Sequence, residues 1–222
     1  MSGFKSLMTN QVAVDVIFYD IKEKVLLCCD RMNGDLLRAE KKIDSNEPII
    51  RDYLLENYLQ NNSVRNLLEF TEFSFQPEVR ERDSVKSRTK YGNIDIKILI
   101  KRLSFDDVKA YFIIECKRID GTGTMNNKYV IDGVCRFVSK KSYYTTYKNR
   151  NFMLGFVVKD IDIDANAQSI SETQNKLSDI SVLQPFVRQN DDVYVYSSKY
   201  NHKSEIVELV HIFYDFSKVV GI

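Results

Sequence analysis

The sequence of 222 residues has few of the residues that mark unfolded or fibrous chains, with only three prolines and eight glycines. This low content argues against a disordered or collagen-like protein. No stretch resembles a Gly/Ser or Pro linker, and no segment repeats. We therefore expect a single domain over residues 1–222, in which residues 1–43 form an N-terminal extension of undefined structure.

Histidine and cysteine are also scarce, with two histidines and four cysteines. No C-x-x-C pair occurs, and the adjacent Cys28 and Cys29 make a poor disulfide framework. These counts argue against a structural zinc site and favour a reducing, cytoplasmic compartment. No apolar run approaches the roughly 18 residues of a membrane span. No signal-peptide core precedes Asp15, so we expect no membrane partner.

Charge of either sign is nearly balanced, because 32 Lys and Arg face 31 Asp and Glu. The net charge of +1 excludes a polycation or an acidic tail protein, but it does not exclude local basic patches.

Hydrophobic periodicity alternates between helical and strand-like segments along the chain. Residues 44–48 contain a cap residue, an acid and a proline, which predicts a helix start that continues through residues 49–62. Residues 12–21 could form a strand, whereas residues 36–43 favour a helix. Further helices are expected at 125–141 and 164–177, and strands at 70–83, 93–101, 109–117, 151–159 and 192–198; residues 205–216 suit either a strand or a short helix. This order predicts an α/β or α+β domain, with a mixed central β-sheet flanked by helices.

Two of the expected strands carry polar residues on matching faces. In residues 94–101 isoleucine fills the even positions to 100, while Asp95 and Lys97 share the other face. In residues 111–117, Glu115 and Lys117 share one face in the same way. If the strands pair as a hairpin, the core faces must coincide, so Asp95 lies opposite either Glu115 or Lys117.

Either register gathers Asp95, Glu115 and Lys117 into one cluster. Two carboxylates can hold a hard divalent cation such as Mg²⁺, which also accepts phosphate oxygens and activates water. A nearby lysine can orient that water or stabilise charge on a phosphate. The alternative is that these residues lie on a solvated strand face without a function. Burying carboxylates in so apolar a strand costs free energy, however, which favours a functional role for them.

The segments 92–96 (GNIDI) and 114–117 (IECK), about twenty residues apart, resemble the PD-(D/E)XK nuclease superfamily. Residues 128–138 are similar to the helix that follows this motif in uncharacterised bacterial and phage-defence members. The resemblance covers residues 44–216 loosely, and it implies a restriction-endonuclease-like fold. It departs from the family pattern in lacking the literal proline before the aspartate.

The resemblance implies that Asp95 and Glu115 are the metal ligands and catalytic residues, and that Lys117 is the catalytic lysine. The implied cofactor is Mg²⁺, with Mn²⁺ as a substitute. Many members add a glutamate from the preceding helix. Glu47 is the preferred candidate, although an acid there also suits the helix dipole; Glu56 and Glu78 remain alternatives.

Two basic segments would contact nucleic acid. Residues 79–102 hold eight Lys and Arg against three acids, and residues 136–150 hold five with no acid and three tyrosines. Basic residues interleaved with tyrosines suit phosphate contact and base packing, although most such runs are simply solvated. The expected contact residues are Arg88, Lys90, Tyr129, Arg136, Lys140 and Lys141.

The leading functional hypothesis is a Mg²⁺-dependent DNA endonuclease in restriction, phage defence or repair. Its expected partner is DNA, taken as double-stranded. A homodimer is left open, because cutting both strands of a duplex needs two sites. The alternatives are a module that binds nucleic acid or protein without cleaving, and a structural or regulatory subunit.

Overall fold

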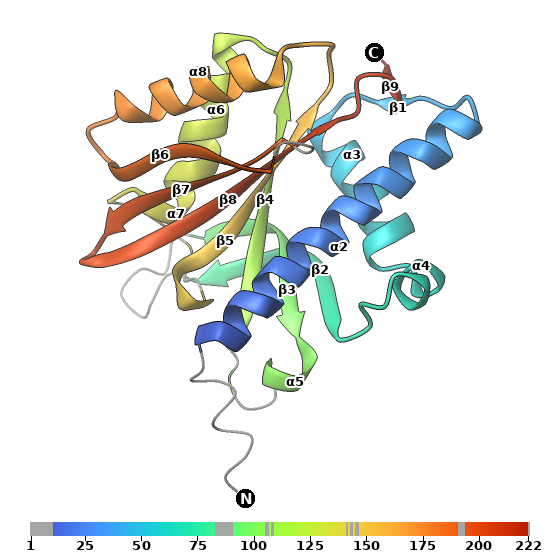
Figure 1. Cartoon of the computed structure of the whole chain (residues 1–222), viewed down its shortest axis with the longest axis horizontal. Helices are drawn as coiled ribbons and strands as arrows, with labels where there is room; N and C mark the ends of the chain where they lie inside the picture. Colours follow the sequence, from blue (N-terminus) through green and yellow to red (C-terminus); the bar gives the residue numbers. More distant parts are fainter. Residues whose placement is uncertain are drawn as a thin grey trace, which may run out of the picture.

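The computed structural model describes residues 11–82, 91–104, 107, 109–140, 142, 144, 147–190 and 194–221. The centre is a seven-stranded mixed sheet of order β2-β3-β4-β5-β8-β7-β6 (Figure 1). Its strands are β2 (Phe73–Arg82), β3 (Tyr91–Ile100), β4 (Tyr111–Ile119), β5 (Arg150–Val157), β6 (Ser181–Asn190), β7 (Val195–His202) and β8 (Glu205–Asp215). The protein is therefore mixed α/β, as the alternating periodicities predict.

Strand directions divide the sheet into three parts. The strands β2, β3 and β4 are antiparallel to their neighbours, and β5 runs parallel to both β4 and β8. Beyond β8, β7 pairs antiparallel with β8, and β6 pairs antiparallel with β7. Ile96 lies opposite Ile114, so the first of the two expected β3–β4 registers is confirmed. A separate parallel pair joins β1 (Ile43–Asp44) to β9 (Val220–Gly221).

The helices follow the predicted order with short π-helical turns inserted. They are α2 (Gln11–Arg38), α3 (Glu47–Leu54), the π-helical turn η1 (Leu55–Leu59), α4 (Asn62–Leu67), α5 (Lys101–Ser104), α6 (Gly123–Tyr129), the π-helical turn η2 (Val130–Val134), α7 (Cys135–Val138), the 3-10 turn η3 (Tyr147–Asn149) and α8 (Ile163–Asn175). Within the described ranges, no helix combines the length and apolarity that a bilayer crossing requires.

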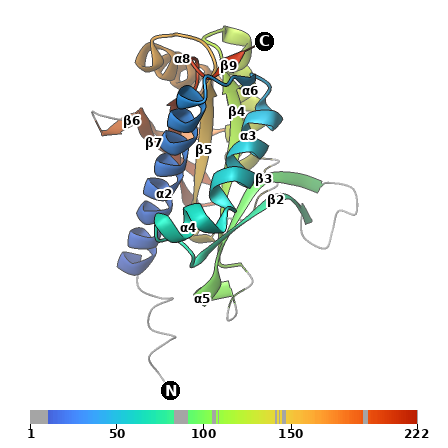
Figure 2. The same cartoon turned by 90° about the vertical axis from the view of Figure 1, so that its right-hand side faces the viewer.

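Two apolar layers hold these elements together, one on each face of the sheet. The layer on the α2 side contains side chains from α2, α3, η1 and the even positions of β3 and β4. The layer on the opposite face contains side chains from α6, η2, α7 and α8 with odd positions of β4, such as Ile113. Figures 1 and 2 show α2 crossing the sheet beside α3 and α4, with α8 and α6 away from it.

The N-terminal segment is part of the core rather than an extension. The expected strand at residues 12–21 is wrong, because α2 runs unbroken from Gln11 to Arg38. Its buried residues, among them Val14, Phe18, Ile21 and Val25, recur every three or four positions. This helical spacing was hidden by the loose alternation of smaller apolar residues around it.

Elsewhere the expected elements are largely confirmed. Residues 205–216 resolve to the strand β8, and the helix start at residues 44–48 becomes α3, with Asn46 as its N-cap. The strand β6 was not expected from the sequence. It lies at the edge of the sheet, alternates exposed with half-buried positions, and contains Pro185, which is tolerated only at such an edge.

The packing of α2 predicts the effect of shortening Phe18. Its fully buried ring stacks on Phe152 at 4.2 Å between centroids and meets Phe112 edge-on at 5.2 Å. Phe18→Ala should lower the free energy of unfolding by about 3–5 kcal/mol in urea titrations. Val16→Ala, on the exposed side of α2, should change it by less than about 0.5 kcal/mol. Equal stability of the two variants would contradict a core role for α2.

Candidate active site

The predicted cluster forms where β3 and β4 separate. Their ladder of paired residues runs from Leu99 and Tyr111 to Ile96 and Ile114. At the next position the Asp95 side chain turns toward β4, and its Oδ2 accepts a hydrogen bond of 2.8 Å from the main-chain N–H of Cys116. The carboxylate thus replaces a strand-to-strand hydrogen bond, which fixes it beside Glu115 and Lys117.

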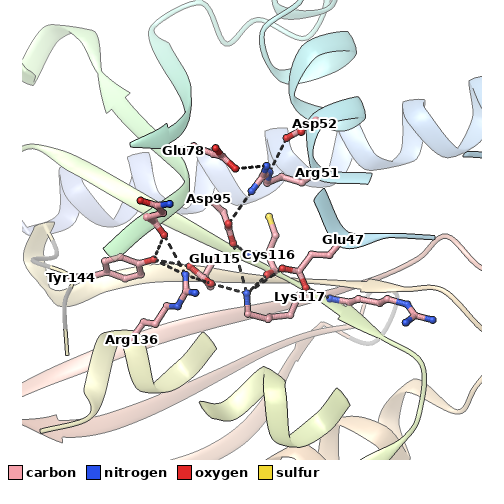
Figure 3. Close-up of polar contacts among 12 residues, drawn as sticks. Glu47, Arg51, Asp52, Glu78, Asp95, Glu115, Cys116, Lys117, Arg136 and Tyr144 are labelled. Atoms are coloured by element: carbon pink, nitrogen blue, oxygen red, sulfur yellow. Dashed lines mark hydrogen bonds and ion pairs between the residues drawn. The ribbon is translucent and has the colours of Figure 1, made fainter. Parts of the chain in front are cut away.

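The ammonium group of Lys117 lies at the centre of this cluster (Figure 3). Its Nζ is 2.7 Å from Glu115 Oε1, 3.3 Å from Glu47 Oε1 and 3.9 Å from Asp95 Oδ2. It also donates to the main-chain carbonyl oxygen of Cys116 at 2.6 Å. Lys117 is only 7% exposed, so its charge is balanced by these oxygens rather than by water.

The helix α3 contributes Glu47 from its first turn. One carboxylate oxygen contacts Lys117, and the other accepts the main-chain N–H of Arg118 at 2.9 Å. Glu47 therefore ties the start of α3 to the exposed end of β4. Of the three glutamates considered from the sequence, Glu47 alone contacts Lys117 in the described part of the chain.

Arg51, one turn further along α3, pairs with the other side of Asp95. Its Nη1 lies 3.1 Å from Asp95 Oδ1, and its Nη2 lies 2.9 Å from Glu78 Oε1. Its Nε also donates to Asp52 at 2.8 Å. One buried guanidinium thus bridges three carboxylates, and it holds Asp95 from the side opposite Lys117.

Glu115 has no solvent exposure and is held by two further groups. Arg136 Nη1 lies 2.7 Å from its Oε1, and the Tyr144 hydroxyl lies 2.9 Å from its Oε2. Arg136 also donates to the Tyr144 hydroxyl at 3.0 Å, and both contact the carbonyl oxygen of Asn93. These contacts satisfy a carboxylate that burial would otherwise make costly.

Burial and charge shift the proton affinities in the cluster. Burial, reinforced by the neighbouring Asp95 charge, raises the pKa of Glu115 from 4.5 to about 7. Burial alone would lower the pKa of Lys117, but Glu115, Asp95 and Glu47 outweigh it and raise that pKa. Lys117 is consequently a permanent cation and hydrogen-bond donor at neutral pH.

A hollow of about 310 Å³ opens beside the cluster. The cations Lys117, Arg118, Lys128 and Arg136 line it together with the acids Glu47 and Asp132. The excess of cations makes the hollow suited to an anion.

Gly133 lets the segment from α6 to α7 pack closely against Lys117. A Cβ atom at this position would lie 2.6 Å from Met153 Cε and 3.5 Å from Lys117 Cγ. The stem of Lys117 is therefore confined by the helix, and its ammonium is directed toward the carboxylates.

One predicted nucleic-acid contact is wrong, because Tyr129 is fully buried. Its hydroxyl lies 2.9 Å from Nδ1 of His211, which is also buried and whose pKa burial lowers to about 3. The sequence placed Tyr129 on one helix face with Arg136 and Lys140. The π-helical turn η2 intervenes, and its wider turn shifts the phase of the residues that follow.

The other predicted contacts divide into three groups. Arg136 lies in the cluster, whereas Lys140 is exposed near the end of α7. Arg88, Lys90 and Lys141 lie outside the described residues.

The two alternative glutamates lie away from Lys117. Glu56 is exposed on η1, and Glu78 contacts Arg51. Glu78 occupies the left-handed region with φ 42°, a strained conformation for a non-glycine residue and one that is often found near functional sites.

Arg51 and Tyr144 are the cluster residues that the sequence reasoning missed. The signal for Arg51 was its spacing, because a residue four positions after Glu47 lies on the same side of a helix. Tyr144 had no comparable signal in this role, since its contact with Glu115 depends on how the chain folds back after α7.

The oxygen atoms of the cluster are the hard ligands that Mg²⁺ prefers. Within the described ranges, no three His, Cys, Asp or Glu side chains are spaced as a metal-ligand set. The reason is visible in the geometry, because three carboxylates and a carbonyl oxygen already surround one ammonium. Mg²⁺ commonly takes only one or two protein carboxylates. The carboxylates of Asp95 and Glu115 and the Cys116 carbonyl are the candidate oxygen donors for such an ion, and Lys117 Nζ contacts all three groups in this structure.

Comparisons of the chain with models of protein families, with curated proteins and with solved structures found no match.

The pKa of Glu115 can be measured through its carboxyl carbon by NMR. We expect titration near pH 7 in metal-free protein, and a lower pKa in Asp95→Asn, because that change removes a neighbouring negative charge. Asp52→Asn is the control and should leave it unchanged. Since the folded-state pKa is the higher one, Glu115 should reduce stability as pH rises from 4.5 to about 7. An ordinary titration near pH 4.5 would contradict this account.

Proposed function

We propose that this chain is a Mg²⁺-dependent endonuclease that hydrolyses DNA phosphodiester bonds. One observation carries the proposal. The ammonium group of Lys117 contacts three carboxylates, those of Asp95, Glu115 and Glu47, which come from three different elements. Asp95, Glu115 and Lys117 are also the residues that resemble the nuclease motif in sequence.

The order of elements around the cluster supports a restriction-endonuclease-like fold of the PD-(D/E)XK superfamily. The helix α3 precedes three antiparallel strands, the segment from α6 to α7 follows, and β5 then joins parallel to β4. On this reading α2, α8 and β6–β8 are additions around that core.

The charge of the cluster supports a bound divalent cation. Five carboxylates (Glu47, Asp52, Glu78, Asp95 and Glu115) contact three cations (Arg51, Lys117 and Arg136), which leaves a formal charge of −2. One Mg²⁺ would neutralise this excess. When bound, the ion would supply an activated water and would offset charge on the scissile phosphate.

Lys117 would act as a charged hydrogen-bond donor in this reaction rather than as a base. Its raised pKa keeps Nζ protonated while the carboxylates remain charged. After leaving Glu115, the ammonium can orient the attacking water or donate to a phosphate oxygen, where negative charge grows in the transition state.

The basic hollow beside Lys117 supports a phosphate substrate. Arg118, Lys128 and Arg136 border it on the solvent side of the cluster. Arg136 holds Glu115 and keeps 32% of its side chain exposed. The same guanidinium can therefore position a metal ligand and contact the incoming phosphate.

A second candidate function is binding of nucleic acid without cleavage on the same fold. The observation that favours it is the position of Lys117. Its Nζ makes close contacts with Glu115 and Glu47 and a longer contact with Asp95. On that reading the cluster is a closed salt-bridge network, and metal does not displace the ammonium.

Cleavage assays distinguish the two candidates. Plasmid and oligonucleotide DNA should be cut in Mg²⁺ or Mn²⁺, and Lys117→Met should reduce the rate by roughly 10²–10³-fold, because it removes a positioned donor. Lys109→Gln, an exposed lysine at the start of β4, is the matched control and should cut normally. Full activity in Lys117→Met would refute the assigned site, provided both variants show native circular dichroism.

Metal binding can be tested without any substrate. Mg²⁺ at about 100-fold over its dissociation constant should stabilise the fold by about 2.7 kcal/mol and raise Tm accordingly. Asp95→Asn should abolish the shift, whereas Asp52→Asn, which leaves the proposed ligands intact, should retain it. A metal-insensitive Tm in the wild-type protein would favour the non-catalytic candidate.

A further inference from the structure

A second basic hollow, of about 290 Å³, lies where the end of α7 meets the turn between β7 and β8. Its lining includes two lysines and a histidine, Lys140, Lys203 and His202. It also includes the neutral polar residues Ser181 and Asn201. Asp179 is the acid in the lining. The hollow shares no lining residue with the hollow beside Lys117.

The β7–β8 turn builds this hollow. His202 pairs with Glu205, so the two residues between them form a tight hairpin. Lys203 and Ser204 both have positive φ, of 50° and 68°, as the favoured two-residue hairpin turn requires. The turn therefore presents Lys203 at a defined position at the rim.

His202 is fixed by hydrogen bonds to both ring nitrogens. Its Nδ1 donates to the carbonyl oxygen of Val138 at 3.1 Å, and its Nε2 lies 2.9 Å from the Ser142 hydroxyl. Burial, followed by the charge of Lys203, lowers the pKa of His202. The imidazole is thus a neutral wall that joins the turn to α7, and the two lysines carry the charge.

The two lysines of this hollow are exposed, and within the described part of the chain neither forms an ion pair with an acid. Lys203 makes a weak contact of 3.4 Å with the Ser142 hydroxyl. Two uncompensated ammonium groups beside hydroxyl and amide donors match an anion with several acceptor oxygens, such as a phosphate group.

A third hollow, of about 390 Å³, joins this one to the catalytic cluster. It shares Ser178 and Asp179 with the basic hollow at the β7–β8 turn, and it shares Arg136 with the hollow beside Lys117. Lining residues are thus shared from the hollow beside Lys117 to the third hollow, and from the third hollow to the one beside Lys203. A ligand with phosphates repeated along a chain can occupy both ends at once.

We propose that the hollow at the β7–β8 turn binds a backbone phosphate of the same strand whose scissile phosphate lies at Lys117. This inference rests on the proposed function and extends it. The substrate is an oligonucleotide long enough to reach from Lys117 to Lys140 and Lys203, and mononucleotides or very short oligonucleotides do not engage the second hollow.

Salt-dependent binding tests this proposal without requiring cleavage. The variant Lys140→Gln/Lys203→Asn removes both charges, and asparagine tolerates the left-handed backbone at position 203. The control Arg102→Gln/Lys109→Gln removes two exposed charges at α5 and the start of β4. Binding of a labelled strand of about 16 nucleotides, the upper end of known single-strand site sizes, is measured in metal-free buffer over a range of salt concentrations.

We expect the first variant to bind more weakly and its salt slope to fall by about 0.7, which corresponds to one lost phosphate contact on a single strand. The control should keep the wild-type slope. Asp179→Asn should act in the opposite direction and tighten binding, because it removes the acid at the junction of the hollows. If wild-type cleavage is observed, the first variant should raise KM for the long strand, leave kcat unchanged, and have no effect on a strand of about 4 nucleotides, the shortest site size.

Equal slopes for the first variant and the control would overturn the inference, as would a wild-type protein that binds no oligonucleotide. Inorganic phosphate, titrated alone, tests the other source of this chemistry. Suppose that phosphate binds at Lys140 and Lys203 but that replacing these lysines leaves the oligonucleotide affinity unchanged. The hollow would then be a site for free phosphate, and the proposal would be overturned. If the wild-type protein cleaves no DNA but the Lys140→Gln/Lys203→Asn variant still shows a reduced salt slope, the result would count against the proposed function and not against this inference.

Discussion

The buried ammonium of Lys117 is the interaction on which the arrangement of the site depends. Glu115 has no solvent exposure, and a buried carboxylate without a cation would be neutralised or expelled. Lys117 and Arg136 offset part of this cost, although burial still raises the pKa of Glu115 to about 7, and Lys117 also gathers Glu47 and Asp95 from two other elements. Its charge therefore fixes where α3, β3 and β4 meet.

The two central carboxylates of the cluster, those of Asp95 and Glu115, each contact more than one partner. Asp95 uses one oxygen for the main-chain N–H of Cys116 and the other for Arg51, so it is held from both sides. Glu115 is similarly shared between Lys117 and Arg136. Each carboxylate thus has its orientation fixed before any ligand arrives, and the remaining negative charge is the property that a divalent cation would use.

The sequence predicted the strands and the register of the site well, because period-two alternation with isoleucine on one face determines which side chains share a surface. Asp95, Glu115 and Lys117 follow from that pattern, whereas Glu47 was a candidate only through the resemblance to the nuclease superfamily. The long helix α2, the edge strand β6 and the burial of Tyr129 were missed. Each depends on tertiary packing or on a π-helical turn, which local periodicity does not reveal. The same limit applies to Arg51 and Tyr144, whose partners are distant in sequence.

We propose that the cluster around Lys117 is a metal site that Lys117 itself occupies in the absence of metal. It is tested most directly by a crystal structure obtained with Mn²⁺, located by its anomalous scattering. The account predicts an anomalous peak bound by Asp95, Glu115 and the Cys116 carbonyl, with Lys117 Nζ displaced from its 2.7 Å contact with Glu115. A crystal saturated with Mn²⁺ that shows no peak there, and Lys117 still in place, would contradict it.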